Sequence, residues 1–242
     1  MRIKVIVPVS TDMWNKMIKE QYEKYKDPDT EIDVINIKKG PESITSLYDD
    51  AWAALFTIKE AEKAEEEGYD GVIIYCMLDP ALQAVKQALT IPAVGIAETS
   101  LHLAHQLGNR LAMIGPGPIG IDTNKNYATF GDEGRYGLPA PVSLREGAEL
   151  EDQVLDIFKK MDEVKKGLLK AAKKAIEEDG ADVILLDCGA LVEPTEYLQK
   201  NLDVPVVSNS IPALKTLEMM IKLGLSQSKK AFPKPEKKKR LM

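Results

Sequence analysis

Two segments of this chain repeat one pattern. Residues 68–76 read GYDGVIIYC and residues 180–188 read GADVILLDC, so each segment opens with glycine, has aspartate third and closes with cysteine. Each is followed, at nearly equal distance, by a proline inside an aliphatic stretch, at Pro92 and Pro205. A repeat of this kind predicts two related halves, each placing one thiol at the end of a buried strand.

Short apolar strands alternate with longer helical segments along the chain, which predicts βαβ crossovers and parallel sheets. The expected strands cover residues 3–7, 31–37, 71–75, 93–95, 111–114 and 182–186. The expected helices cover about 11–25, 44–67, a segment after Asp79-Pro80, 98–107, 151–178 and 210–223. The first of these helices is predicted to begin with a capping side chain from Ser10, Thr11 or Asp12.

The predicted fold is α/β, with two pseudo-twofold-related domains that each hold a mainly parallel sheet flanked by helices. The active site is expected in the cleft between them, because open α/β sheets bind ligands at the carboxyl ends of their strands. The first domain is predicted to comprise residues 1–95 plus 208–242 and to carry Cys76. The second comprises 96–207 and carries Cys188. The basic, proline-interrupted tail, 232–242, is predicted to be frayed or to contact a partner.

The composition excludes several classes of function. A net charge of −6 with 44% hydrophobic and 29% charged residues is typical of a globular protein and predicts no nucleic-acid surface. No apolar run approaches the length of a membrane span, and the first residues do not resemble a signal peptide, so we expect a cytoplasmic protein without membrane contact. Two cysteines in 242 residues do not form a disulfide framework, and the histidines have no metal-site spacing. We expect free thiols and no metal.

A thiolate is both a nucleophile and a proton acceptor, and its ordinary pKa near 8.5 allows nearby charges to set the form present at neutral pH. Each cysteine precedes a predicted helix, whose positive end would favour the thiolate. After Cys76, Asp79 is expected to cap that helix. After Cys188, Gly189 allows the backbone to approach a ligand. The alternatives are two buried core cysteines matched by descent from a duplicated ancestor, or a disulfide between them.

Polar residues after the other strands are candidate substrate contacts. Glu98, Thr99 and Ser100 follow one strand, and Ser208 and Asn209 take the equivalent place in the second half; for all of them, helix capping competes with ligand contact. The hydroxyl groups and amides of the first loop are expected to hold a carboxylate or imide, and bare amides after the 111–114 strand to shape a pocket. The predicted substrate-binding residues are Pro8, Ser10, Thr11, Met77, Gly115, Pro116, Gly189 and Ala190.

Several motifs resemble one family over nearly the entire chain. Residues 76–82 match a Cys-x-x-Asp-Pro-x-Leu segment, 92–100 resemble a Pro-Val-x-Gly-Ile-x-Glu-Ala-Ser stretch, and 224–229 match a closing Gly-Leu-Ser-x-Ser-Lys. Residues 186–191 correspond to a Leu-Gly-Cys-Ala-Gly-Met signature, and 136–138 also look like a family segment. On these motifs the sequence resembles the aspartate/glutamate/hydantoin racemase superfamily, and its hydantoin racemase branch most closely.

The resemblance implies a cofactor-independent racemase or epimerase that acts as a homo-oligomer on a small molecule, an amino acid or a hydantoin-type ring. One thiolate, from Cys76 or Cys188, would take a proton from a carbon next to a carbonyl, and the other thiol would return one on the opposite face. The first loop, 6–11, lacks the family's two asparagines, and Gly115 and Asp187 replace a usual threonine and glycine. The alternatives are a maleate isomerase-like or decarboxylase-like enzyme of the same fold, and a non-catalytic ligand-binding protein.

Overall fold

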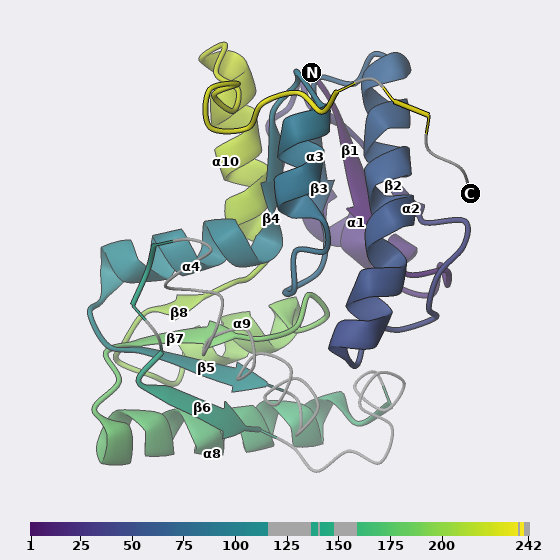
Figure 1. Ribbon diagram of the computed structural model, residues 1–242. Coiled ribbons are helices and arrows are strands. Elements are labelled where there is room, and N and C mark those ends of the chain that lie inside the picture. The colour runs from purple at the N-terminus through teal and green to yellow at the C-terminus, as the bar shows by residue number, and fades with distance from the viewer. Residues whose placement is uncertain (116–136, 140, 148–158, 237, 240–242) are drawn as a thin grey trace.

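The computed structural model describes residues 1–115, 137–139, 141–147, 159–236 and 238–239, and it contains two parallel four-stranded sheets (Figure 1). The first sheet has the order β2-β1-β3-β4, with β1 Arg2–Val7, β2 Glu31–Asn36, β3 Gly71–Ile74 and β4 Ala93–Gly95. The second has the order β6-β5-β7-β8, with β5 Leu111–Gly115, β6 Ser143–Glu146, β7 Val183–Leu186 and β8 Val206–Val207. The helices are α1 Asn15–Tyr25, α2 Leu47–Glu66, α3 Leu82–Ala88, α4 Ile96–Leu107, α8 Met161–Asp179, α9 Val192–Gln199 and α10 Ile211–Lys222.

The two sheets are built alike, which confirms the predicted fold class. In each, the central strand (β1 or β5) pairs with the strand that leads to a cysteine (β3 or β7), and the next strand lies at the edge. The repeated glycine has a structural reason: Gly68 follows α2 with φ +77° and Gly180 follows α8 with φ +68°. A left-handed residue ends each helix, and glycine adopts that conformation without the cost of a Cβ atom.

Helices α4 and α10 cross between the halves. Helix α4 follows the first sheet but packs its Ala97 and Leu101 against Val183 and Leu185 of the second. Helix α10 follows the second sheet but packs on the first, where Leu217 meets the backbone of Gly71 so closely that an added Cβ would lie 2.8 Å from its side chain. In Figure 1, α4 lies between the two sheets and α10 stands beside the first. The domain boundaries themselves stay a prediction.

Several elements differ from the sequence-based expectation, among them the two-residue strand β8, which the expected strands do not include. Helix α1 begins at Asn15 rather than near residue 11, and no side chain caps it; the amide and hydroxyl groups of Ser10 instead donate to the carbonyl oxygen of Pro41. Strand β6, at 143–146, was not predicted, because this edge strand has no apolar run and its Arg145 forms an ion pair with Asp179. Helix α8 ends as expected but begins only at Met161, because Lys160 before it is not helical; residues 151–158 of the predicted helix lie outside the described residues.

The C-terminal segment after α10 packs against the first half, crossing α3 toward α2 in Figure 1. The side-chain amide of Gln227 pairs with both backbone groups of Ala93 in the edge strand β4, accepting at 3.0 Å and donating at 2.7 Å. The ammonium group of Lys229 donates to the carbonyl oxygen of Lys86 at 2.7 Å, and the Phe232 ring lies 5.5 Å from the Lys86 ammonium group. Phe232 thus packs against the first half, while the described residues after it, 233–236 and 238–239, are exposed. No helix in the described part of the chain is long and apolar enough to cross a membrane.

Replacing Gln227 with alanine is expected to lower the free energy of unfolding by about 1–3 kcal/mol, because it leaves a buried N–H and C=O of the edge strand without partners. Urea denaturation followed by circular dichroism measures this change. The matched control is Gln106→Ala on the exposed face of α4, which removes the same side chain and should change stability little. Equal stability of the two variants would show that the tail does not hold β4.

Candidate active site

The two cysteines occupy equivalent turns. The amide of Asp79 donates to the carbonyl oxygen of Cys76 at 2.9 Å, and the amide of Leu191 donates to that of Cys188 at 3.0 Å. In each turn the amide two residues after the cysteine, from Leu78 or Ala190, donates a hydrogen bond to the sulfur atom. The sequence repeat thus produces two cysteine turns with the same hydrogen bonds, each at the carboxyl end of the strands of its sheet.

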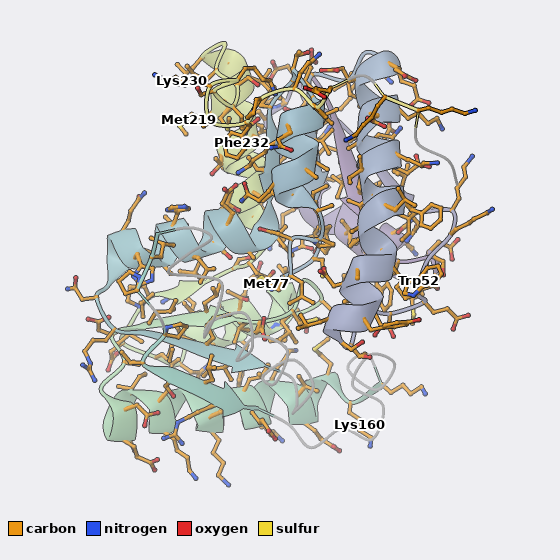
Figure 2. All side chains as sticks on the ribbon, in the orientation of Figure 1. Trp52, Met77, Lys160, Met219, Lys230 and Phe232 are labelled. Atoms are coloured by element: carbon orange, nitrogen blue, oxygen red, sulfur yellow. The ribbon has the colours of Figure 1, made fainter. Side chains whose placement is uncertain are left out.

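The fold brings the two turns together. The hydroxyl group of Tyr75, the residue before Cys76, donates to the carbonyl oxygen of Gly189, the residue after Cys188, at 2.8 Å. The thiols are near enough for negative charge on Cys188 to raise the pKa of Cys76. Both are free thiols, so the disulfide alternative is wrong. Met77 packs against the hydrophobic cores of both halves and lies between them in Figure 2.

Burial of the sulfur atoms, rather than the helix ends, dominates the acidity of both cysteines. Although each residue is partly exposed, desolvation of its sulfur raises the pKa of Cys188 to about 11 and that of Cys76 further still. The carboxylates of Asp50 and Asp79 add to the increase in the pKa of Cys76, and that of Asp187 adds to the increase at Cys188. Since burial disfavours the charged form, both groups are thiols at neutral pH.

The rate of alkylation by iodoacetamide is therefore expected to rise about tenfold per pH unit across roughly pH 7 to 10, because only the thiolate reacts and its fraction grows at that rate below the pKa. Cys188 should react before Cys76, since its pKa is the less raised. Mass spectrometry of the two cysteine peptides measures each rate, with urea-unfolded protein as the control. A plateau of the native rates near pH 8.5 would contradict the raised pKa values.

Asp79 does not cap the helix that follows it, as the sequence suggested. Helix α3 begins only at Leu82, and the buried carboxylate of Asp79 instead accepts hydrogen bonds from the amides of Ala97 and Glu98, at 3.1 and 2.8 Å. These are first-turn amides of α4, where a negative charge is stabilised by the unpaired N–H groups and the helix dipole. Asp79 thereby fixes the Cys76 turn to the helix that packs on the second sheet.

The other predicted contacts of the first half lie around the end of β1. The amide of Tyr75 donates to the carbonyl oxygen of Ile6, so the loop after β1 lies beside the Cys76 turn. This loop contains the buried Pro8, the exposed Ser10 and Thr11, whose carbonyl oxygen accepts a hydrogen bond from Asn36. Their position fits substrate contact, which stays a prediction for each of them.

In the second half, the amide of Asp187 donates to the carbonyl oxygen of Ile114, which places the end of β5 beside the Cys188 turn. Gly115 is the last residue of β5, and Gly189 and Ala190 are half-buried in the turn itself. Pro116 lies outside the described residues. Substrate contact by these residues also stays a prediction.

Several polar candidates have structural roles. The carboxylate of Glu98 forms an ion pair with Lys86. The hydroxyl group of Thr99 donates to the carbonyl oxygen of Gly95, just before α4, and that of Ser100 donates to the carbonyl oxygen of Ile96. The side-chain amide of Asn209 donates to the carbonyl oxygen of Leu186, and Ser208 lines a separate surface pocket beside α1 and α9. Within the described residues, no group of three or more His, Cys, Asp or Glu side chains could hold a metal ion.

The comparisons with known proteins agree with this geometry. The family model described as Asp/Glu/Hydantoin racemase matches residues 3–214. The chain is 35% identical to the hydantoin racemase of Pseudomonas sp. (strain NS671), over 98% of this chain and 93% of that protein. It is 30% identical to the hydantoin racemase of Paenarthrobacter aurescens, over the full length of both. The solved structure of an allantoin racemase from Klebsiella pneumoniae superimposes with a TM-score of 0.89 at 26% identity, covering 100% of this chain and 96% of that one. The chain therefore belongs to the Asp/Glu/hydantoin racemase family of isomerases.

Proposed function

We propose that this protein racemises a hydantoin-type ring without a cofactor, with Cys76 and Cys188 as its two acid/base groups. The observation that carries the proposal is the pair of equivalent cysteine turns, held against each other by the hydrogen bond from Tyr75 to Gly189. The names of the relatives support the class of substrate: two are hydantoin racemases, and allantoin, the substrate named for the structural neighbour, also contains a hydantoin ring.

In the proposed reaction, one sulfur is a thiolate and removes the proton from the ring carbon next to the carbonyl. The electron pair of the broken C–H bond moves toward the carbonyl oxygen, giving an enolate, and the opposite thiol then protonates the carbon on its other face. The negative charge has then passed from one sulfur to the other. The amides of Leu78 and Ala190 donate to the two sulfurs, so each stabilises its own sulfur when that sulfur is charged.

The raised pKa values make the reactive form a minor one at neutral pH. In the singly ionised protein the negative charge lies mainly on Cys188, because its pKa is the less raised, and Cys76 stays a thiol. Cys188 is then the base and Cys76 the acid, and the reverse reaction starts from the other singly ionised form. A reducing cytoplasm would keep both thiols available, and we propose that compartment for the protein.

The test is to incubate single enantiomers of 5-isopropylhydantoin, 5-benzylhydantoin and allantoin, together with free L- and D-amino acids, and to follow optical rotation and concentration. Loss of rotation at constant concentration, for a hydantoin and not for the amino acids, is the expected result. Racemisation of amino acids alone would contradict the substrate class. An arylmalonate is added to the panel as a further compound, and its loss of a carboxyl group without racemisation of any compound would favour the decarboxylase alternative.

A further inference from the structure

A buried chain of hydrogen bonds lies directly behind the two cysteines. The side-chain amide of Gln21 donates to the hydroxyl oxygen of Ser210 at 2.7 Å. Burial raises the pKa of Tyr75 well above its ordinary value, and a hydrogen bond from the Ser210 hydroxyl group to the Tyr75 oxygen offsets part of that increase. The Tyr75 hydroxyl group reaches the carbonyl oxygen of Gly189 at 2.8 Å and the side-chain oxygen of Gln21 at 3.0 Å. In a low-dielectric interior such a fully connected chain holds its members in one arrangement.

The members of this chain come from both halves of the molecule. Tyr75 lies between β3 and Cys76 in the first half, and Gly189 follows Cys188 in the second. Gln21 belongs to α1, and Ser210 immediately precedes α10, the helix that returns from the second half to the first. Tyr75 thus precedes one cysteine in the sequence, and its phenol group is hydrogen-bonded to the residue that follows the other cysteine. It therefore connects the two turns directly.

Packing contacts also hold the Tyr75 ring in place, in addition to the hydrogen bonds of its hydroxyl group. A Cβ atom added at Gly189 would lie 2.5 Å from Cε1 of Tyr75, so the Gly189 backbone rests against the ring edge. The ring also meets Tyr22 in an edge-to-face contact, with centroids 5.9 Å apart. Tyr75 is 6% exposed, and Tyr22 and Gln21 are buried beside it. Because the ring is held in this way, a shift of one cysteine turn would also shift the other.

We propose that Tyr75 is a positioning residue that sets the separation of the two thiols across the substrate. This inference rests on the proposed function, because only a two-thiol reaction needs both sulfurs in place at once. The enolate formed by one thiol must be protonated by the other before the proton returns to the face it left. A displacement of about 1 Å between reacting groups can cost on the order of 100-fold in rate.

The test compares Tyr75→Phe with Tyr22→Phe, in D2O, using a hydantoin that the wild type inverts. Tyr75→Phe removes the hydroxyl group that reaches Gly189 and should slow inversion by about 10- to 100-fold with little change in KM. Deuterium in the recovered starting enantiomer should increase relative to inversion, because a longer-lived enolate allows the first thiol to exchange its proton with D2O and to return a deuteron to the same face. Tyr22→Phe is the matched control: it removes a buried hydroxyl group that donates to the Ser210 carbonyl oxygen at 3.2 Å rather than to the backbone of a cysteine turn, and it keeps the ring that packs on Tyr75. It should leave the ratio of exchange to inversion unchanged.

Gly189→Ala supplies an independent variant, since the added methyl group would lie 2.5 Å from Cε1 of Tyr75 and would displace the ring while leaving its hydroxyl group present. It should raise the same ratio, and circular dichroism shows whether each variant is folded. A loss of folded protein lowers exchange and inversion equally, so the ratio separates positioning from stability. If the wild type racemises a hydantoin and both folded variants keep its ratio, the role of Tyr75 is refuted while the proposed function stands. If the wild type neither exchanges nor inverts any hydantoin, the proposed function fails and the inference fails with it.

Discussion

Replacing Cys76 or Cys188 with serine is expected to lower the rate of inversion of a hydantoin by about 10²–10⁴-fold, the usual contribution of a positioned acid or base. An alcohol is a much weaker acid than a thiol, so serine does not form the charged base in this buried site. It also transfers a proton less readily to the enolate. Chiral chromatography of reactions started from each enantiomer measures both directions, and both should fall, because each cysteine takes part in each direction.

The variants are informative only if they are folded, so thermal unfolding of each is the accompanying control. The change from sulfur to oxygen is small, and the turns are held by backbone hydrogen bonds that serine retains. Wild-type rates in a folded Cys76→Ser or Cys188→Ser protein would contradict a role for that thiol. A loss in one direction alone would show that the second group is not a cysteine.

Gly95→Ala is expected to lower the free energy of unfolding by about 1–3 kcal/mol, the usual cost of forcing one methyl group into a packed interior. The new Cβ atom would lie 2.2 Å from the carboxyl carbon of Asp79, whose side chain is fully buried. Displacing Asp79 would also break its two hydrogen bonds to the first turn of α4. Urea unfolding should show a lower midpoint, and activity should fall with it because Asp79 holds the Cys76 turn.

A double-mutant cycle identifies the cause. Asp79→Ala alone removes the carboxylate and its hydrogen bonds, and it also makes room for the methyl group of Gly95→Ala. The double variant should therefore lose less stability than the sum of the two single changes, with a coupling typical of residues in contact. Additive effects would show that the methyl group and the carboxylate do not compete for the same space.

The repeated features of the chain could be predicted from sequence, because each is encoded locally. The aliphatic runs before Cys76 and Cys188 become the buried strands β3 and β7, and each run is bounded by residues that strands avoid. Gly68 and Gly180 end the preceding helices for a backbone reason that acts within a few residues. The predicted placement of each cysteine just after a buried strand is therefore confirmed, and the equivalence of the two turns follows from the repeat.

The features that depend on tertiary contacts could not be predicted. Strand β6, 143–146, has no apolar periodicity, since it is an edge strand with polar side chains. Local capping rules assign Asp79 to the helix after it, but its carboxylate reaches α4, 18 residues further along the chain. Tyr75 was also missed. Its only signal was a tyrosine where the second copy has Asp187, and its reach to Gly189 spans 114 residues.

The most direct test of the two-thiol account is where deuterium first appears when one enantiomer of a hydantoin reacts in D2O. If one thiol removes the proton and the other delivers a solvent-derived one, the product enantiomer should carry deuterium from the first turnovers while the remaining starting enantiomer keeps its hydrogen. NMR after chiral separation at low conversion measures both. Deuterium appearing equally in both enantiomers, or product that retains the original hydrogen, would show that a single group serves both faces and would contradict the account.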